Sequence, residues 1–159
     1  MTPTALVITV SDRSAAGDRE DAGGPIAVAA LREAGYACGD AVIVPDGADA
    51  VERALRDGLD LGAQLIVTTG GTGVGPRDRT PEGTARVLER EVPGIAEELR
   101  RRGATEKATA LLSRGLAGVA SGALIVNLPG SPRAVACGMP LILEVAAHVI
   151  GQLAGEDHA

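Results

Sequence analysis

The sequence of 159 residues contains no tryptophan, no phenylalanine and a single tyrosine, so aromatic rings cannot build its core. The core must be packed with valine, leucine, isoleucine and alanine, a mixture that suits parallel strands covered by helices of small residues. The shortage of rings also argues against recognition by base stacking, which many single-strand nucleic-acid binders use.

Positive charge is also in short supply. Lysine and arginine number 15 against 21 aspartates and glutamates, which gives a formal net charge of −6. Such a balance disfavours non-specific attraction to a polyphosphate backbone. The one dense basic cluster, ELRRRG at 98–103, is typical of a solvated helix face. We therefore expect no nucleic-acid partner.

Cysteine and histidine are equally sparse, with two of each. Cys38 and Cys137 lie far apart without zinc-ligand spacing, which predicts small core residues in a reducing cytosol. His148 is expected to be structural and His158 to lie in a loose tail. No apolar run approaches the ~18 residues of a membrane-spanning helix, and no signal-peptide pattern opens the chain. These features predict a soluble cytoplasmic protein without a membrane partner.

What the sequence does contain is an alternation of strand-like runs with segments of helical periodicity. Strands are expected at 4–10, 41–44 and 64–69, and helices after the first two. The first helix should run from Gly24-Pro25 to Gly35, and Asp49 should cap the second. This alternation favours an α/β fold with a parallel sheet.

The second half of the chain is less regular. One helix is expected to run through Val87, and another to start near residues 92–94. The segment 115–128 predicts either a hairpin that turns at Ser121-Gly122 or one further strand. Ser131-Pro132 should cap the last helical stretch, which Pro140 should break in two. Without a linker or repeat, the chain is expected to form one domain, 1–159, with residues 155–159 as a frayed tail.

The strongest functional signal is LIVTTGGTGVGPRDRTPE at 65–82, which has four glycines within six residues after a strand. Glycines let backbone N–H groups approach an anion closely, and ligands of open α/β sheets bind at the carboxyl ends of strands. Thr80 is expected to cap a following helix, with Pro81 in its first position. The sequence therefore predicts a phosphate site. It is not a Walker A motif, because Pro76-Arg77 stands where Lys-Ser/Thr is required.

Polar loops follow other strands and are expected at the same edge of the sheet. These are Ser11-Asp12-Arg13, Pro45-Asp46-Gly47 and, if the preceding strand runs parallel, 127–132. Asp46 and Asp78 would then present two ionised carboxylates, the ligands that Mg²⁺ with a nucleotide prefers. A plain turn residue is the alternative for Asp46.

Five blocks of the sequence together resemble the molybdopterin adenylyltransferase family, which includes the bacterial Mog and MoaB proteins. They occur in the family's order over nearly the whole chain: SDR…AG…D (11–21), VPDG (44–47), GGTGVGPRDRTPE (70–82), LSRG (112–115) and NLPGSP (127–132). The resemblance implies a three-layer α/β/α sandwich with a mostly parallel sheet, usually assembled as a homotrimer.

The same resemblance implies an activity. The terminal phosphate of molybdopterin would attack the α-phosphorus of Mg·ATP, giving adenylyl-molybdopterin and pyrophosphate. The product would pass to a partner protein that inserts molybdate. Asp46 and Asp78 would hold Mg²⁺ and support catalysis.

The resemblance further implies a set of residues that bind the nucleotide and molybdopterin, with Ser113 at the pterin end. They are Ser11, Asp12, Gly70, Gly71, Thr72, Gly73, Thr80, Pro81, Glu82, Ser113, Asn127, Pro129 and Gly130. Positive charge for the phosphates could come from Arg77, Arg79, Lys107 or Arg114.

Two alternatives remain open. One is a non-catalytic molybdopterin carrier of the MoaB type, because the segment after NLPGSP is short, as in MoaB-like members. The other is a hydrolase of nucleotide metabolites related to competence-damage proteins, whose glycine loops match less well. The presence of both Asp46 and Asp78 favours the enzyme over the carrier.

Overall fold

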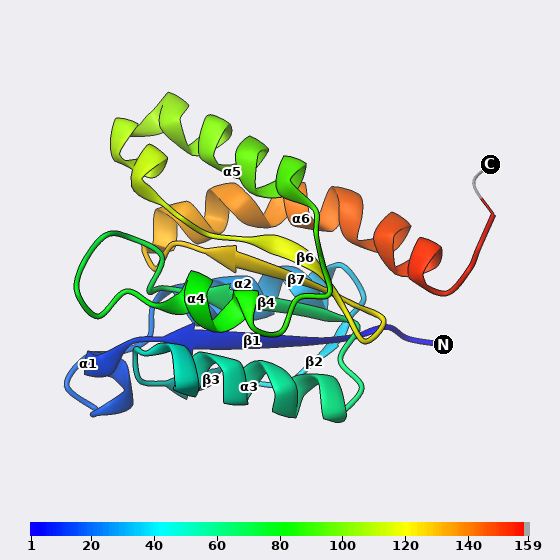
Figure 1. Cartoon of the computed structure of the whole chain (residues 1–159), viewed down its shortest axis with the longest axis horizontal. Helices are drawn as coiled ribbons and strands as arrows, with labels where there is room; N and C mark the ends of the chain where they lie inside the picture. Colours follow the sequence, from blue (N-terminus) through cyan, green and yellow to red (C-terminus); the bar gives the residue numbers. More distant parts are fainter. Residues whose placement is uncertain (158–159) are drawn as a thin grey trace.

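The computed structural model describes residues 1–157, and its centre is a seven-stranded sheet (Figure 1). The strand order is β2-β1-β4-β7-β6-β5, and β3 pairs with β1 further along the edge that β2 occupies. β1 pairs in parallel with β2, β3 and β4, and β4 pairs in parallel with β7. β6 is antiparallel to both of its neighbours, β7 and β5. The strands are β1 (Thr4–Val10), β2 (Ala37–Cys38), β3 (Val42–Val44), β4 (Leu65–Thr69), β5 (Arg90–Glu91), β6 (Ala117–Ala120) and β7 (Ala123–Leu128).

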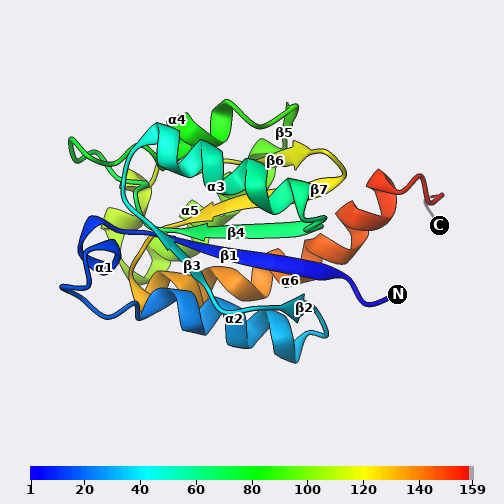
Figure 2. The ribbon, with the colours of Figure 1, turned by 90° about the horizontal axis from the view of Figure 1, so that it is seen from below.

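Helices cover both faces of this sheet, which confirms the predicted three-layer α/β/α sandwich. Figure 2 shows α3 and α4 on one face and α2 and α6 on the other. The helices are α1 (Asp12–Ala15), α2 (Gly23–Glu33), α3 (Ala48–Asp60), α4 (Thr80–Ala85), α5 (Pro93–Glu106) and α6 (Pro132–Leu153), with a 3₁₀ helix, η1 (Ala108–Leu112).

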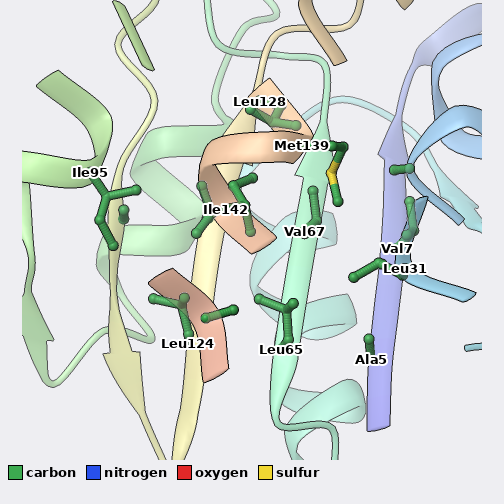
Figure 3. Packing of buried hydrophobic residues seen from close by; sticks show 14 of the residues in the cluster. Ala5, Val7, Leu31, Leu65, Val67, Ile95, Leu124, Leu128, Met139 and Ile142 are labelled. Carbon is green, nitrogen blue, oxygen red and sulfur yellow. The ribbon is translucent and has the colours of Figure 1, made fainter. Parts of the chain in front are cut away.

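The strands are apolar on both faces, so each face has its own core. Successive residues point to opposite sides of a strand. Val67 therefore packs in the larger cluster with residues of α2, α5 and α6 (Figure 3), whereas its neighbour Ile66 packs with Val51 and Leu55 of α3. This two-sided burial explains why the central strands read as continuous apolar runs.

The C-terminal half settles two of the open predictions. Residues 115–128 form the β6–β7 hairpin, and Ser121 and Gly122 have positive φ angles of 49° and 76°, as a two-residue hairpin turn requires. Pro140, in contrast, does not break α6, which runs unbroken from Pro132 to Leu153. The expected break was wrong because buried contacts of neighbours such as Met139 and Ile142 hold the helix on the sheet.

Both predicted caps within the first half of the chain were wrong in detail. The N-cap of α3 is Gly47, with no side-chain cap, and the Asp49 carboxylate instead accepts a hydrogen bond from Arg86 at 2.7 Å. Thr80 is the first residue of α4 rather than its cap, and its hydroxyl donates to the Gly70 carbonyl. The predicted Ser131 cap of α6 is confirmed, since Ser131 Oγ accepts the Ala134 N–H at 3.1 Å.

The chain after α6 begins as an ordered turn. Gly155 and Glu156 donate backbone hydrogen bonds to the carbonyls of Gln152 and Gly151. Residues 158–159 of the expected tail, including His158, lie outside the described residues.

Two further predictions concern α6 and the cysteines. Within residues 1–157, α6 is the one helix long and apolar enough to cross a membrane, but it packs in the core through residues such as Val135 and Ile142. Cys38 and Cys137 are free thiols that are partly exposed rather than fully buried. His148 is exposed on α6.

The topology brings four loops to one place. The parallel strands β1, β3, β4 and β7 all have their carboxyl ends at the same end of the sheet, opposite the end where the N-terminus lies (Figure 1). The register pairs Thr9 with Thr69 and Thr69 with Leu128, so the strand ends are level. The loops predicted to share a site therefore do meet.

Candidate functional site

The loop after β4, residues 70–79, is called the glycine loop below, and its first two residues are tightly enclosed. Gly70 and Gly71 have φ angles of +92° and +69°. A Cβ on Gly70 would lie 2.3 Å from the Val10 carbonyl oxygen, and one on Gly71 would lie 2.2 Å from Thr80 Oγ1. Glycine is therefore required at both positions by conformation and by space.

Three backbone amides of this loop have no partner among residues 1–157 and belong to residues that line a cavity. Gly70 N–H donates to the Leu128 carbonyl, but the N–H groups of Gly71, Thr72 and Gly73 have no acceptor within the described chain. These three residues all line a cavity. Consecutive free amides that line a concave wall are suited to binding an anion. The helix that follows, α4, has only six residues, so the amides rather than the helix end provide the attraction.

Two of the cavities that adjoin the glycine loop meet each other. The η1-side cavity, of about 430 Å³, lies between the loop, η1 and the start of α6. The α1-side cavity, of about 340 Å³, lies between the loop, the end of β1 and the start of α2. Gly71, Asp78, Gly130 and Ser131 line both, so the two spaces meet at the glycine loop. Together they can accept an elongated ligand that passes Asp78.

Asp46 and Asp78 both line the α1-side cavity, as predicted for a pair of acids with a common ligand. Asp46 Oδ2 accepts the Asp12 N–H at 2.9 Å, and Asp78 Oδ2 accepts the Gly75 N–H at 2.9 Å. Burial raises the pKa of Asp46, and the negative charges of Asp12 and Asp78 raise it further, against the lowering effect of the hydrogen bond from Asp12. This excess of negative charge is the environment that a bound cation relieves.

Asp12 and Arg77 tie three of the loops together. The Arg77 guanidinium donates to both carboxylate oxygens of Asp12 at 3.1 Å and to the Asp46 carbonyl at 3.0 Å. Asp12 and Asp46 also exchange backbone N–H to carboxylate hydrogen bonds. The hydrogen bond from Arg77 lowers the pKa of Asp12. In this structure the side chains of Asp12 and Arg77 bind other residues of the protein, so their role is to hold the loops in place.

Arg114 holds the glycine loop to α4. Its Nε donates to the Gly73 carbonyl at 2.8 Å, and its Nη2 donates to the Asp78 carbonyl at 2.9 Å. Its two terminal nitrogens also bind the two carboxylate oxygens of Glu82 at 2.6 and 3.2 Å. Hydrogen bonding in this pair raises the pKa of Arg114 and lowers that of Glu82. A guanidinium has five N–H donors, so these contacts leave little of it for a phosphate.

Asn127 lies beneath the loops rather than in either cavity. It is 3% exposed, and its amide donates to the hydroxyls of Thr68 and Thr84 at 2.9 and 3.0 Å. Its Oδ1 accepts the Leu116 N–H at 3.0 Å. Every polar atom of the side chain is thus used to join β7, β4 and α4 with the entrance to β6.

The predicted site residues therefore divide into two groups. Those that line one or both cavities are Ser11, Asp46, Gly70, Gly71, Thr72, Gly73, Asp78, Ser113, Pro129 and Gly130. Those that line neither are Asp12, Thr80, Pro81, Glu82 and Asn127. Glu82 instead lines a further cavity with Asp46 and Arg79.

Basic side chains line both cavities, although most of them are not the predicted ones. Lys107 and Arg133 line the η1-side cavity, where Arg133 lies 3.7 Å from Glu106, and Arg19 lines the α1-side cavity. Of the four predicted basic residues only Lys107 lines either space. Arg19 and Arg133 carried no sequence signal that separates them from surface arginines.

A second missed feature lies at the end of β1. Asp21 Oδ2 accepts the Thr9 hydroxyl at 2.7 Å and its Oδ1 accepts the Gly24 N–H at 3.0 Å, which fixes the wall of the α1-side cavity. The spacing AG…D contains this aspartate. Its partner Thr9, however, lies within an ordinary apolar strand, so the sequence gives no signal of the pairing.

Comparison with known proteins agrees with this geometry. A family model described as "Probable molybdopterin binding domain" matches residues 6–148. The chain belongs to this family. Solved structures agree: the Mog protein of Mycobacterium ulcerans is 40% identical, with a TM-score of 0.91 over 98% of this chain and 99% of that one. MoaB from Thermus thermophilus is 39% identical, with a TM-score of 0.88 over 98% of each chain.

Curated relatives have two kinds of name. "Molybdopterin adenylyltransferase" of Haemophilus influenzae is 38% identical over 132 residues, which are 81% of this chain and 67% of the relative. "Molybdenum cofactor biosynthesis bifunctional protein" of Synechococcus elongatus is 40% identical over 97% of this chain and 48% of the relative. The chain thus spans about half the length of the bifunctional relatives that it matches.

Proposed function

We propose that this protein is a molybdopterin adenylyltransferase in molybdenum cofactor biosynthesis. The observation that carries the proposal is the pair of carboxylates, Asp46 and Asp78, in a cavity that also reaches the free amides of the glycine loop. Relatives with that printed name are 35–38% identical to this chain.

The proposed reaction transfers an adenylyl group between phosphates. An oxygen of the terminal phosphate of molybdopterin forms a bond to the α-phosphorus of ATP, and the bond from that phosphorus to the bridging oxygen breaks. Pyrophosphate leaves with the electron pair, and adenylyl-molybdopterin remains. The nucleophile is already an anion, so the protein needs no general base and contributes mainly by positioning and by balancing charge.

The described residues can supply both contributions. The amides of Gly71, Thr72 and Gly73 would donate hydrogen bonds to phosphate oxygens. Two joined cavities would hold the two substrates on either side of Asp78. Lys107 and Arg19, one in each cavity, would offset negative charge as the anions approach each other.

The acids also suit Mg²⁺, which would arrive with ATP. Asp46 and Asp78 are hard oxygen ligands in one cavity. Burial raises the pKa of Asp46, and the negative charges of Asp12 and Asp78, which a cation would balance, raise it further. Within residues 1–157 no group of three or more ligating side chains forms a closed metal site. This fits an ion held by two carboxylates, with phosphate and water as its other ligands. When bound, Mg²⁺ would stabilise the charge that develops on the triphosphate.

The proposal includes a homotrimer in the cytoplasm and transfer of the product to a molybdate-inserting partner. Light scattering coupled to size-exclusion chromatography measures the number of chains in the assembly. A mass of three chains is expected, and a monomer would remove this part of the proposal.

The decisive experiment mixes the purified protein with molybdopterin, ATP and Mg²⁺ and follows pyrophosphate and adenylylated product. We expect both to form together, and neither to form without molybdopterin or after Mg²⁺ is chelated. Binding of molybdopterin without any pyrophosphate would replace the enzyme with the carrier. Hydrolysis of ATP without molybdopterin would instead favour the hydrolase.

A further inference from the structure

The Arg114 guanidinium bonds to both ends of the segment that carries Asp78. Gly73 and Asp78, whose carbonyls accept its hydrogen bonds, enclose an outward arch of the glycine loop. At the top of this arch Val74 is 73% exposed. Within the arch, the Asp78 N–H donates to the Gly75 carbonyl and the Gly75 N–H donates to the Asp78 carboxylate. The direction of the Asp78 side chain therefore depends on where the base of the arch is held.

Arg114 is itself fixed from three directions. Glu82 of α4 binds it through two oxygens, and its own N–H donates to the Thr72 carbonyl at 2.8 Å. On the far side, Arg100 of α5 donates to the Ser113 and Gly115 carbonyls, which flank Arg114 in the chain. The guanidinium thus connects the arch to α4, while the backbone on either side of Arg114 is held to α5 on the opposite face of the sheet.

Arg77, an arginine of the loop itself, is held less firmly. Arg77 is 65% exposed, and its carboxylate partner Asp12 is 43% exposed. Arg114 and Glu82 are 36% and 38% exposed. Exposed pairs are weakened by water and salt, so Arg114, which is less exposed and makes four side-chain hydrogen bonds, is the arginine able to fix the arch.

We propose that Arg114 is a positioning residue, which holds residues 73–78 through two backbone carbonyls so that Asp78 faces the ligand cavities. Its role rests on the proposed adenylyl transfer, although the hold on the loop can be measured without it. Arg114 needs no contact with substrate for this role, because a shift of about 1 Å in a reacting group can reduce the rate about 100-fold.

The test compares two substitutions with a matched control. Arg114→Ala removes all four contacts, and Arg114→Lys keeps the charge but cannot span both carbonyls and Glu82. Arg86→Ala is the control, because Arg86 caps the other end of α4 and pairs with Asp49 and Glu52 without touching the glycine loop.

The first measurement is the steady-state rate of pyrophosphate release with molybdopterin and Mg·ATP. For Arg114→Ala we expect kcat to fall about 100-fold while KM for ATP changes less than about threefold. Arg114→Lys should stay about tenfold or more below the parent, because charge alone does not restore the bridge. Arg86→Ala should keep the parent kcat within about twofold.

The second measurement needs no activity. The chain has no tryptophan, so Val74→Trp introduces a single reporter at the top of the arch. Its fluorescence anisotropy should fall when Arg114→Ala is added and stay unchanged when Arg86→Ala is added. Thermal unfolding of each variant shows whether the fold is intact.

The outcomes separate the two proposals. Parent-like kcat or unchanged anisotropy in Arg114→Ala, full recovery in Arg114→Lys, or equal losses in Arg114→Ala and Arg86→Ala would each overturn the positioning role. If the parent protein forms no product, the proposed function fails. A fall of the anisotropy confined to Arg114→Ala would then still support the hold on the loop, and no fall would overturn it.

Discussion

Glycines occupy turns at both ends of the sheet, but for different reasons. At the end near the chain termini, Gly35, Gly62 and Gly122 have positive φ angles, and a Cβ on any of them would meet nothing within 4 Å. At the other end Gly70 and Gly71 have similar angles, yet a Cβ on either would lie under 2.5 Å from a protein oxygen. The first set serves the backbone direction alone. The second also lets segments from β1, β4 and α4 approach closely enough to form a ligand site.

The largest expected effect compares an aspartate at each end of the sheet, Asp78 and Asp60. Asp78→Asn removes the charge of one cavity-lining carboxylate, and we expect adenylyl transfer to fall about 10³-fold while molybdopterin binding stays near that of the parent. Asp60→Asn, at the exposed end of α3, is the matched change at the other end of the sheet. Product formation and equilibrium binding are measured for both. Equal activity of Asp78→Asn and the parent would remove Asp78 from the site.

The next effect tests the glycines themselves. Gly70→Ala should lower the free energy of unfolding by about 4 kcal/mol, because a left-handed backbone costs ~1–3 kcal/mol and the new methyl group strikes the Val10 carbonyl. Gly62→Ala has the angle without the collision and should cost about 1 kcal/mol. Urea unfolding of the two variants checks the difference. Similar losses would mean that close approach is not what sets the two ends apart.

A smaller effect separates the polar side chains of the two ends. Asn127→Ala should cost about 2 kcal/mol, because Thr68 and Thr84 lose their amide donor and the Leu116 N–H loses its acceptor. Gln64→Ala, at the start of β4, removes only a 3.3 Å contact to the Thr4 N–H and should cost less than about 0.5 kcal/mol. Denaturant titrations compare them, and a larger loss for Gln64→Ala would reverse the assignment.

The smallest effect concerns the pH dependence of stability. The folded protein raises the pKa of Asp46 above its ordinary value of 3.8, so the carboxyl binds its proton more tightly when folded. Ionisation of Asp46 therefore destabilises the fold as the pH rises from the ordinary value through the raised one. Asp46→Asn should have a higher Tm than the parent at pH 7 while it loses activity, and this gain should vanish below the ordinary value. A lower Tm for Asp46→Asn at pH 7 would contradict the burial argument.

Local patterns predicted those parts of the fold that local physics decides. The β-branched run at residues 4–10 gave β1 with its observed limits, and the glycine loop was located before its neighbours were known. The Pro140 prediction failed because burial of α6 on the sheet outweighs one missing backbone hydrogen bond. The Asp49 cap failed because Arg86, 37 residues away, binds that carboxylate.

The same limit applies to the site. The sequence brought Asp46 and Asp78 together through the rule for strand ends and a family resemblance. It could not assign Arg114 to Glu82, or Asp12 to Arg77, because those contacts join residues 32 and 65 positions apart. Side chains predicted to bind phosphate instead bind the protein, and no local pattern distinguishes the two uses.

The outer edges of the sheet have a consequence of another kind. One edge is divided between β2 and β3, of two and three residues, and the other is β5, of two residues. A row of unpaired backbone groups this short cannot guide the addition of a foreign strand, even though Val42 and Ile43 are exposed there. The folded sheet therefore offers little edge for strand-to-strand aggregation, although its strands are apolar.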